Sequence, residues 1–264
     1  MNSFLHLFGK YDRIVCGPDS PVHSASKTIS CMHFEILVED ASGKLMLEQI
    51  VPKILGPKGK PHKYRIINIQ ELKHRVMMQR SPRDRKKLLP WDTILLQTLT
   101  SQLAAYGRSF YKKNSVVIVI VDLDYHQRET FQQTLERCFV GHRPSPDGAV
   151  CLAVEEGEAW LLGDLSAVRH AYPLAKEYVL SSYEQDSICG TWEFLADAIF
   201  RGGSERLTEL GYPHIGREKC KWAESIGQYV DVDRNRSPSF INFRDVLRRL
   251  MLKPLVDEYA EDVD

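Results

Sequence analysis

The chain has 264 residues, of which 43% are hydrophobic and 27% charged, and its formal net charge at pH 7 is zero. This balance is typical of a folded globular protein and argues against intrinsic disorder. The longest apolar run, residues 116–121, has the length of a strand, far below the roughly 18 residues of a membrane-spanning helix.

The first half of the chain predicts two strands and a helix after an unrelated leader. Residues 1–31 lack a hydrophobic period, and we expect an N-terminal extension there, with the working protein beginning at Met32. Residues 33–39 form the first predicted strand. A helix follows through Leu55, with Ser42 as its expected N-cap. Residues 64–69 form the second predicted strand.

Further elements alternate in the same way. We predict helices at 91–106 and 127–139, and buried strands at 115–121 and 149–154. This alternation predicts an α/β fold with a mostly parallel sheet flanked by helices. The rest is helical, with helices expected at residues 155–162, 192–200, 217–230 and 240–252. We therefore expect an α/β domain over 32–164 and a helical portion over 165–264 packed on it, with an acidic tail at 257–264.

Carboxylates follow two of the predicted strands. Glu39 closes the first strand, and Asp122 and Asp124 close the most apolar one. Ligands of open parallel sheets bind outside the carboxyl ends of the strands, and alternate residues of an extended chain face the same way. Clustered carboxylates favour a hard cation such as Mg²⁺. Either acidic element alone could be a solvated turn, but their combination indicates a metal site.

A basic segment lies between the second strand and the next helix. It contains Lys73, Arg75, Arg80, Arg83, Arg85, Lys86 and Lys87. Such a segment could bind the phosphate backbone of a nucleic acid, and it could equally be a solvated loop. The six cysteines contain no CxxC pair, which argues against a zinc ribbon or disulfide framework and fits a reducing cytoplasm.

Several motifs resemble those of known families. The segment VEDASGK at residues 38–44 resembles the first motif of Toprim domains, and VDLD at 121–124 resembles their DxD motif. Toprim domains occur in topoisomerases, primases and OLD nucleases, where these acids hold Mg²⁺ for phosphoryl transfer. The resemblance implies that Glu39, Asp122 and Asp124 bind one or two Mg²⁺ or Mn²⁺ ions and are catalytic.

The resemblance extends to a bacterial Toprim-like family of unknown function, DUF4276, which is often encoded beside an ATPase in anti-phage loci. It rests on VEEGEAWLLGD at residues 154–164 and DRNRSPSF at 233–240. The family resemblance implies a neighbouring ATPase as partner, since this chain has no GxxxxGK[ST] loop of its own.

Other residues near these motifs have two interpretations each. Glu155 and Glu158 are three residues apart on a predicted helix, so they should share a face; Glu158 is the favoured fourth metal ligand and catalytic residue, unless both acids only favour the helix dipole. Asp164 could act at the site or cap the next helix. Asn235, Ser237 and Ser239 could form a polar active-site loop or cap the last helix.

The histidine and lysine candidates are weaker. His126 could shuttle a proton, and Lys219 or Lys221 could stabilise a transition state, but an exposed loop or helix residue is the ordinary interpretation of each.

Taken together, the sequence predicts a cytoplasmic, Mg²⁺- or Mn²⁺-dependent nuclease of the Toprim type, acting on DNA or RNA as the effector of an anti-phage system with a partner ATPase. Two alternatives stay open. The chain could be a non-catalytic, metal-binding partner subunit of that ATPase. It could also be a phosphatase of the haloacid-dehalogenase type, whose nucleophilic Asp also begins a DxD after a strand.

Overall fold

The computed structural model describes residues 31–72, 91–110, 114–187 and 190–252. Three predictions concern parts of the chain outside these ranges. They are the N-terminal extension, the seven basic residues from Lys73 to Lys87, and the acidic tail at 257–264.

Four parallel strands form a single sheet in the described part of the chain. Their order is β2-β1-β3-β4, so β1 and β3 are neighbours in the centre. This confirms the predicted α/β class with a parallel sheet. The strands are β1 (His33–Val38), β2 (Lys63–Asn68), β3 (Ser115–Asp122) and β4 (Gly148–Ala153).

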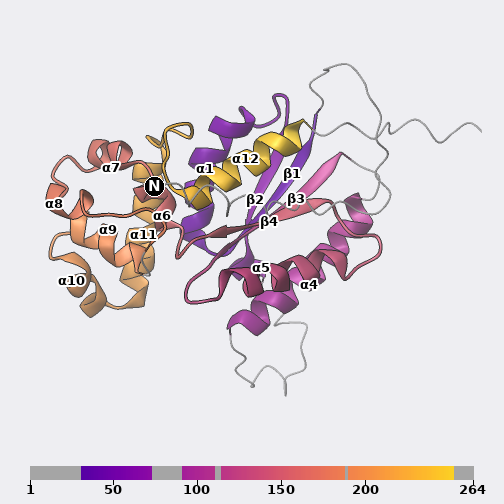
Figure 1. Cartoon of the computed structure of the whole chain (residues 1–264), viewed down its shortest axis with the longest axis horizontal. Helices are drawn as coiled ribbons and strands as arrows, with labels where there is room; N and C mark the ends of the chain where they lie inside the picture. Colours follow the sequence, from indigo (N-terminus) through magenta and orange to yellow (C-terminus); the bar gives the residue numbers. More distant parts are fainter. Residues whose placement is uncertain (1–30, 73–90, 111–113, 188–189, 253–264) are drawn as a thin grey trace, which may run out of the picture.

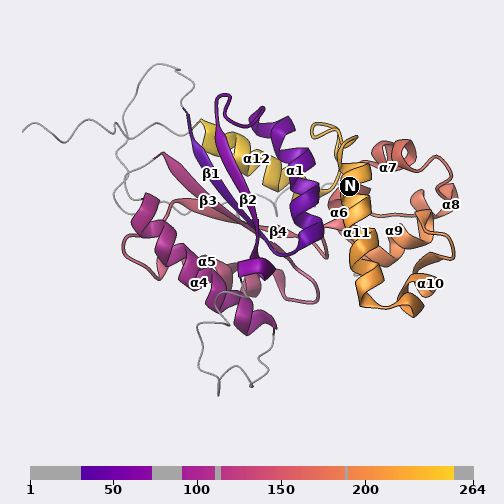
Figure 2. The same cartoon turned by 180° about the vertical axis from the view of Figure 1, so that it is seen from behind.

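Both faces of the sheet are covered by helices, which explains why the central strands are apolar throughout. Alternate residues of β3 enter different cores: Ile118 lies in one and Val119 in the other. Helix α1 (Ala41–Leu55) and helix α12 (Pro238–Met251) cover the first face. Helices α4 (Trp91–Phe110) and α5 (Arg128–Val140) cover the second (Figures 1 and 2).

Right-handed crossovers account for this arrangement. The chain moves from β1 outward to β2, then returns across β1 to β3 and continues to β4. A reversal of direction changes the face on which the crossover helix lies, so α1 and α4 are on opposite faces. The reversal makes the gap between β1 and β3 the topological switch point, where open α/β sheets bind their ligands.

The remaining helices form a lobe beside the carboxyl ends of the strands (Figure 1). Helix α11 packs against α1, and α12 returns across the sheet to reach β4. Apolar residues of the lobe join the core on the α1 face, so residues on both sides of position 164 share one hydrophobic core. The lobe contains α6 (Glu158–Leu162), α7 (Leu165–Ala171), α8 (Glu177–Leu180), α9 (Thr191–Ile199), α10 (Gly203–Leu210) and α11 (Tyr212–Gly227).

None of the helices in the described ranges is both long enough and apolar enough to cross a membrane. Three predicted helix starts were wrong, among them that of α11, which begins at Tyr212 and not at residue 217. Helix α6 begins at Glu158, because Glu155 has a positive φ of 70° that a helix cannot contain. Asp40, not Ser42, caps α1: its Oδ1 accepts a hydrogen bond from the Gly43 N–H at 2.7 Å.

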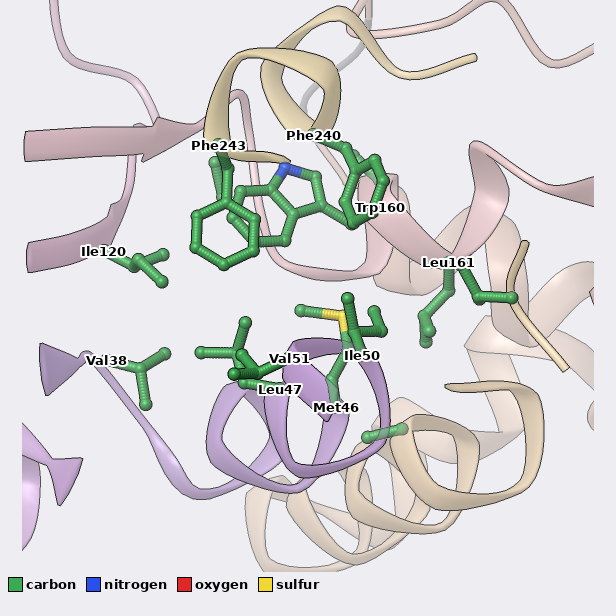
Figure 3. Close-up of a cluster of buried hydrophobic side chains, with 14 of the residues drawn as sticks. Val38, Met46, Leu47, Ile50, Val51, Ile120, Trp160, Leu161, Phe240 and Phe243 are labelled. Carbon is green, nitrogen blue, oxygen red and sulfur yellow. The ribbon is translucent and has the colours of Figure 1, made fainter. Parts of the chain in front are cut away.

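The segment before α12 is fastened to α6. Asn235 Nδ2 donates to the Trp160 carbonyl at 2.8 Å, and the Arg236 N–H donates to the Gly163 carbonyl at 2.8 Å. Trp160 in turn donates from Nε1 to Ser239 Oγ at 2.9 Å. Its indole ring is fully buried and stacks on Phe243, as Figure 3 shows. The polar bonds and the apolar contact therefore join the same two helices.

The contact between α6 and the segment before α12 predicts that one added methyl group will lower the stability of the fold. A Cβ added to Gly163 would overlap the Asn235 side chain, although the backbone of Gly163 is helical and unstrained. We expect Gly163→Ala to lower the free energy of unfolding by about 1–3 kcal/mol, the usual cost of overpacking. Urea denaturation would measure the change.

Gly216→Ala is the matched control, since its added Cβ would have no described atom within 4 Å apart from its chain neighbours and the backbone of its own helix. That substitution, in the interior of α11, should raise stability by about 0.5–1 kcal/mol. Equal effects of the two substitutions would contradict the proposed packing.

Candidate functional site

Two of the predicted acids meet at the switch point. Glu39 directly follows β1, and Asp122 is the last residue of β3, its neighbour in the sheet. The Asp122 N–H donates to Glu39 Oε2 at 3.2 Å. The parallel register thus brings Glu39 and Asp122 side by side, although many residues separate them in the chain.

Two further groups reach the same place from the helical lobe. Glu158 is the first residue of α6, and Lys219 lies on α11, which contacts α6. Lys219 Nζ is 3.0 Å from Glu158 Oε2. The side chains are 14% and 4% exposed, so this ion pair is largely removed from solvent. Because both charges are desolvated, the loss of either partner would be costly.

The electrostatics show that these groups form one cluster. Burial, and then the carboxylates of Glu39 and Asp40, raise the pKa of Asp122 well above its ordinary value. Burial raises the pKa of Glu158 to about 7, against the opposing effect of Lys219. Each carboxylate thus makes it harder to ionise its neighbours.

Lys219 responds in the opposite sense. Burial alone would lower its pKa, but the surrounding carboxylates raise it above its ordinary value, so the side chain stays charged. In order of effect, these carboxylates belong to Glu158, Glu156, Asp122 and Asp40.

A small cavity opens between the strand ends and α1. It is lined by Glu39, Asp40 and Asp122, by Ser42 and Gly43 at the start of α1, and by apolar side chains that include Trp160. Its volume of about 10 Å³ is on the order of the space that one water molecule needs. A cavity of this size and lining suits a small polar group or an ion.

The donor set fits a hard divalent cation. In the described part of the chain, four carboxyl groups act on the ammonium group of Lys219 and a fifth, that of Glu39, acts on Asp122; carboxylate oxygens are the ligands that Mg²⁺ and Mn²⁺ prefer. No three Asp, Glu, His or Cys side chains of the described residues already converge on one point. Ion binding would therefore require side-chain rotation around Lys219. The five groups are those of Glu39, Asp40, Asp122, Glu156 and Glu158.

Asp124 occupies a different setting. The strand ends at Asp122, and Asp124 is exposed with a positive φ of 46°. The sequence predicted that Asp122 and Asp124 face one ion, because alternate residues of a strand point the same way. Asp124 lies outside the strand, so this argument does not apply to it. Its N–H donates to the carbonyl of Glu155 at 2.9 Å.

The expectation that Glu155 and Glu158 share a helix face was wrong. Glu155 precedes α6, and its carboxyl group is influenced by Asp186 and Glu156. Asp164, which could have been catalytic, caps α7: its Oδ1 accepts from the backbone N–H groups of Ser166 and Ala167.

The polar motif before α12 serves internal hydrogen bonds. Ser237 caps α12 by accepting from the Phe240 N–H, and it donates from Oγ to Asp186 Oδ1 at 2.8 Å. The Ser239 N–H donates to Asp186 Oδ2 at 2.7 Å. Asn235, Ser237 and Ser239 are all buried; Ser237 caps the helix, and the other two bond to Trp160, Ser237 and Asp186.

Sequence reasoning undervalued or missed three members of the cluster. Asp40 could have been found from its position next to Glu39. Lys219 was one of two weaker lysine candidates and Glu156 was not considered, because their positions depend on how α11 and the start of α9 pack at the sheet edge. His126, the histidine considered as a proton shuttle, stacks on Phe131 with ring centroids 4.1 Å apart.

The comparisons with known proteins identify one family. Residues 38–248 match the family model described as a domain of unknown function, DUF4276. The match spans the strand-end acids, Glu158, Lys219 and the start of α12. No curated protein and no solved structure matches the chain. Since the family match covers well over half of the sequence, the chain belongs to the DUF4276 family.

Proposed function

We propose that this protein is a Mg²⁺- or Mn²⁺-dependent nuclease of the Toprim type, which hydrolyses phosphodiester bonds at the ends of β1 and β3. The observation that carries the proposal is the imbalance of charge at the switch point. Four carboxyl groups act on Lys219, a fifth acts on Asp122, and Asp122 is strongly disfavoured as an anion. A divalent cation would relieve that repulsion.

The residues of the cluster have separate roles in this proposal. Glu39 and Asp122 hold the cation at the strand ends, with Asp124 available from the adjoining turn. When bound, the cation supplies Lewis-acid stabilisation of the phosphate and an activated water. Glu158, whose pKa is raised to about 7, can accept or release a proton near neutral pH. Lys219 can stabilise negative charge that develops on the phosphate.

We infer a nucleic-acid substrate from the motif resemblance and from the basic segment between Lys73 and Lys87. We infer the partner ATPase from the family resemblance. One described residue adds support. Tyr125 follows Asp124 directly and is 91% exposed, so its ring is available for stacking on a base beside the proposed site. We propose that the protein acts as an anti-phage effector together with an ATPase encoded nearby.

A second candidate is a non-catalytic partner subunit of that ATPase, here taken as metal-independent and thus unlike the metal-binding subunit expected from the sequence. The Lys219–Glu158 ion pair favours it, because an ammonium group already neutralises part of the acidic cluster without a metal. Calorimetric titration with Mn²⁺ separates the two candidates. The nuclease requires binding that Asp122→Asn removes, whereas a metal-independent scaffold would bind no ion at the strand ends.

The nuclease proposal predicts cleavage of supercoiled plasmid DNA or tRNA in the presence of Mn²⁺, alone or with the neighbouring ATPase. Glu39→Gln and Asp122→Asn should each lower the rate at least roughly 100-fold, the usual effect of losing a group that stabilises the transition state. Glu205→Gln, an exposed position on α10, should cleave like the unmodified protein. Cleavage unchanged in Asp122→Asn, or none under any condition, would reject the proposal.

The ion pair predicts a metal-dependent stability. Lys219→Met leaves Glu158 and its neighbours buried without their counter-charge, so in EDTA at pH 8 we expect a loss of about 3–5 kcal/mol in the free energy of unfolding. Mg²⁺ or Mn²⁺ should restore more stability to this variant than to the unmodified protein. The control is Lys221→Met on the same helix, whose exposed pair with Glu218 should contribute at most about 1 kcal/mol.

Glu158 also predicts a pH dependence in metal-free buffer. Its pKa is about 7 when folded and about 4.5 ordinarily, so between these values the folded protein binds more protons than the unfolded chain. Stability should therefore fall as pH rises from about 4.5 to about 7. Glu158→Gln should flatten this slope, whatever its effect on absolute stability, and Glu205→Gln should not. Denaturation midpoints across this range would show the difference.

A further inference from the structure

A second group of oxygen-bearing side chains, two of them buried and one half-buried, lies beyond the end of β4. It consists of Glu155, which follows β4, and Tyr183 and Asp186 from the segment between α8 and α9. Glu155 is 5% exposed and Tyr183 is 9% exposed. The start of α12 closes the group through the hydrogen bonds that Asp186 accepts from Ser237 and Ser239.

Two of these oxygens have unmet bonding capacity. Within the described part of the chain, Glu155 Oε2 is buried and forms no hydrogen bond; the buried Tyr183 hydroxyl has none of ordinary geometry, although the Asp186 backbone N–H lies near it. Gln185 Oε1, in the same segment as Tyr183, is a third such atom. A buried polar atom without a partner commonly costs about 1–3 kcal/mol, and more if it is charged. Such a group calls for a missing water or ion as its explanation.

The charges show that the three side chains act on one another. Burial, followed by the Asp186 and Glu156 carboxylates, raises the pKa of Glu155 to about 7. Burial, Asp186 and Glu155 together raise the pKa of Tyr183, and the Asp186 backbone N–H offsets part of this effect. Two carboxyl groups and a phenol thus share a poorly solvated space in which their anionic forms repel one another.

Asp186 is already oriented as a ligand would be. Each of its carboxylate oxygens accepts one hydrogen bond from the start of α12, which fixes the plane of the group. A carboxylate oxygen has a further lone pair available after one such bond. Supporting hydrogen bonds of this kind are typical of carboxylates that hold metal ions.

We propose that Glu155, Asp186 and Tyr183 bind a hard divalent cation of the Ca²⁺ type, at a site separate from the candidate nuclease centre. All donors are oxygens, and one of them is neutral. Ca²⁺ tolerates such a set, whereas Mg²⁺ demands a nearly ideal octahedron. Bound there, the cation would tie the end of β4 to the start of α12. This inference does not depend on the proposed nuclease activity.

The test is a calorimetric titration of the full chain with Ca²⁺, together with luminescence of Tb³⁺, a Ca²⁺ substitute, excited through aromatic side chains. We expect Ca²⁺ binding that Glu155→Gln weakens at least tenfold and that Asp122→Asn preserves. Tyr183→Phe should weaken binding while leaving both carboxylates in place. Glu184→Gln, at an exposed position beside Tyr183, is the control for charge alone.

Stability gives a second readout. Ca²⁺ should raise the melting temperature of the unmodified protein and of Asp122→Asn, but not that of Glu155→Gln. Asp186→Asn disturbs the cap of α12, so the conclusion rests on the isosteric Glu155→Gln variant, with its fold checked by circular dichroism. The proposal is overturned if Ca²⁺ does not bind, if Glu155→Gln binds it with unchanged affinity, or if Asp122→Asn abolishes the binding.

Discussion

The reversal of chain direction between β1 and β3 is the constraint on which the rest of the molecule depends. It places α1 and α4 on opposite faces of the sheet and leaves a gap where two central strands end side by side. Glu39 and Asp122 stand in that gap, joined by the hydrogen bond from the Asp122 N–H. The acidic centre is thus a direct consequence of strand order, and a different order would separate Glu39 from Asp122.

The carboxylates at this edge of the sheet repel one another, and the helical lobe supplies a positive charge that offsets part of the repulsion. Lys219 reaches from α11 to Glu158 on α6 and lies among acids from several elements. The pair joins α6 to α11 within the lobe, yet it leaves most of the carboxylates without counter-charge. Stability and proposed function therefore draw on the same groups: the acids that destabilise the metal-free protein are those that would bind a cation.

The motif before α12 has a different physical basis from the one that its sequence suggested. Its Ser and Asn side chains resemble an active-site loop in composition, but they satisfy one another, Trp160 and Asp186 in a buried network. Glu155 marks the border between the two acidic regions. Its left-handed backbone bonds to Asp124 on one side, while its carboxyl group is coupled to Asp186 on the other.

The sequence by itself determined the parallel sheet, the helices on both faces and the presence of acids at two strand ends. Hydrophobic periodicity and strand-end position are local properties, so they can be read from neighbouring residues. Only the tertiary structure decided that Lys219 enters the acidic centre, that Glu155 turns away from Glu158, and that Asp124 leaves the strand. Those outcomes depend on helix packing and on single backbone torsions, because contacts between residues distant in the chain leave no periodic pattern in the sequence.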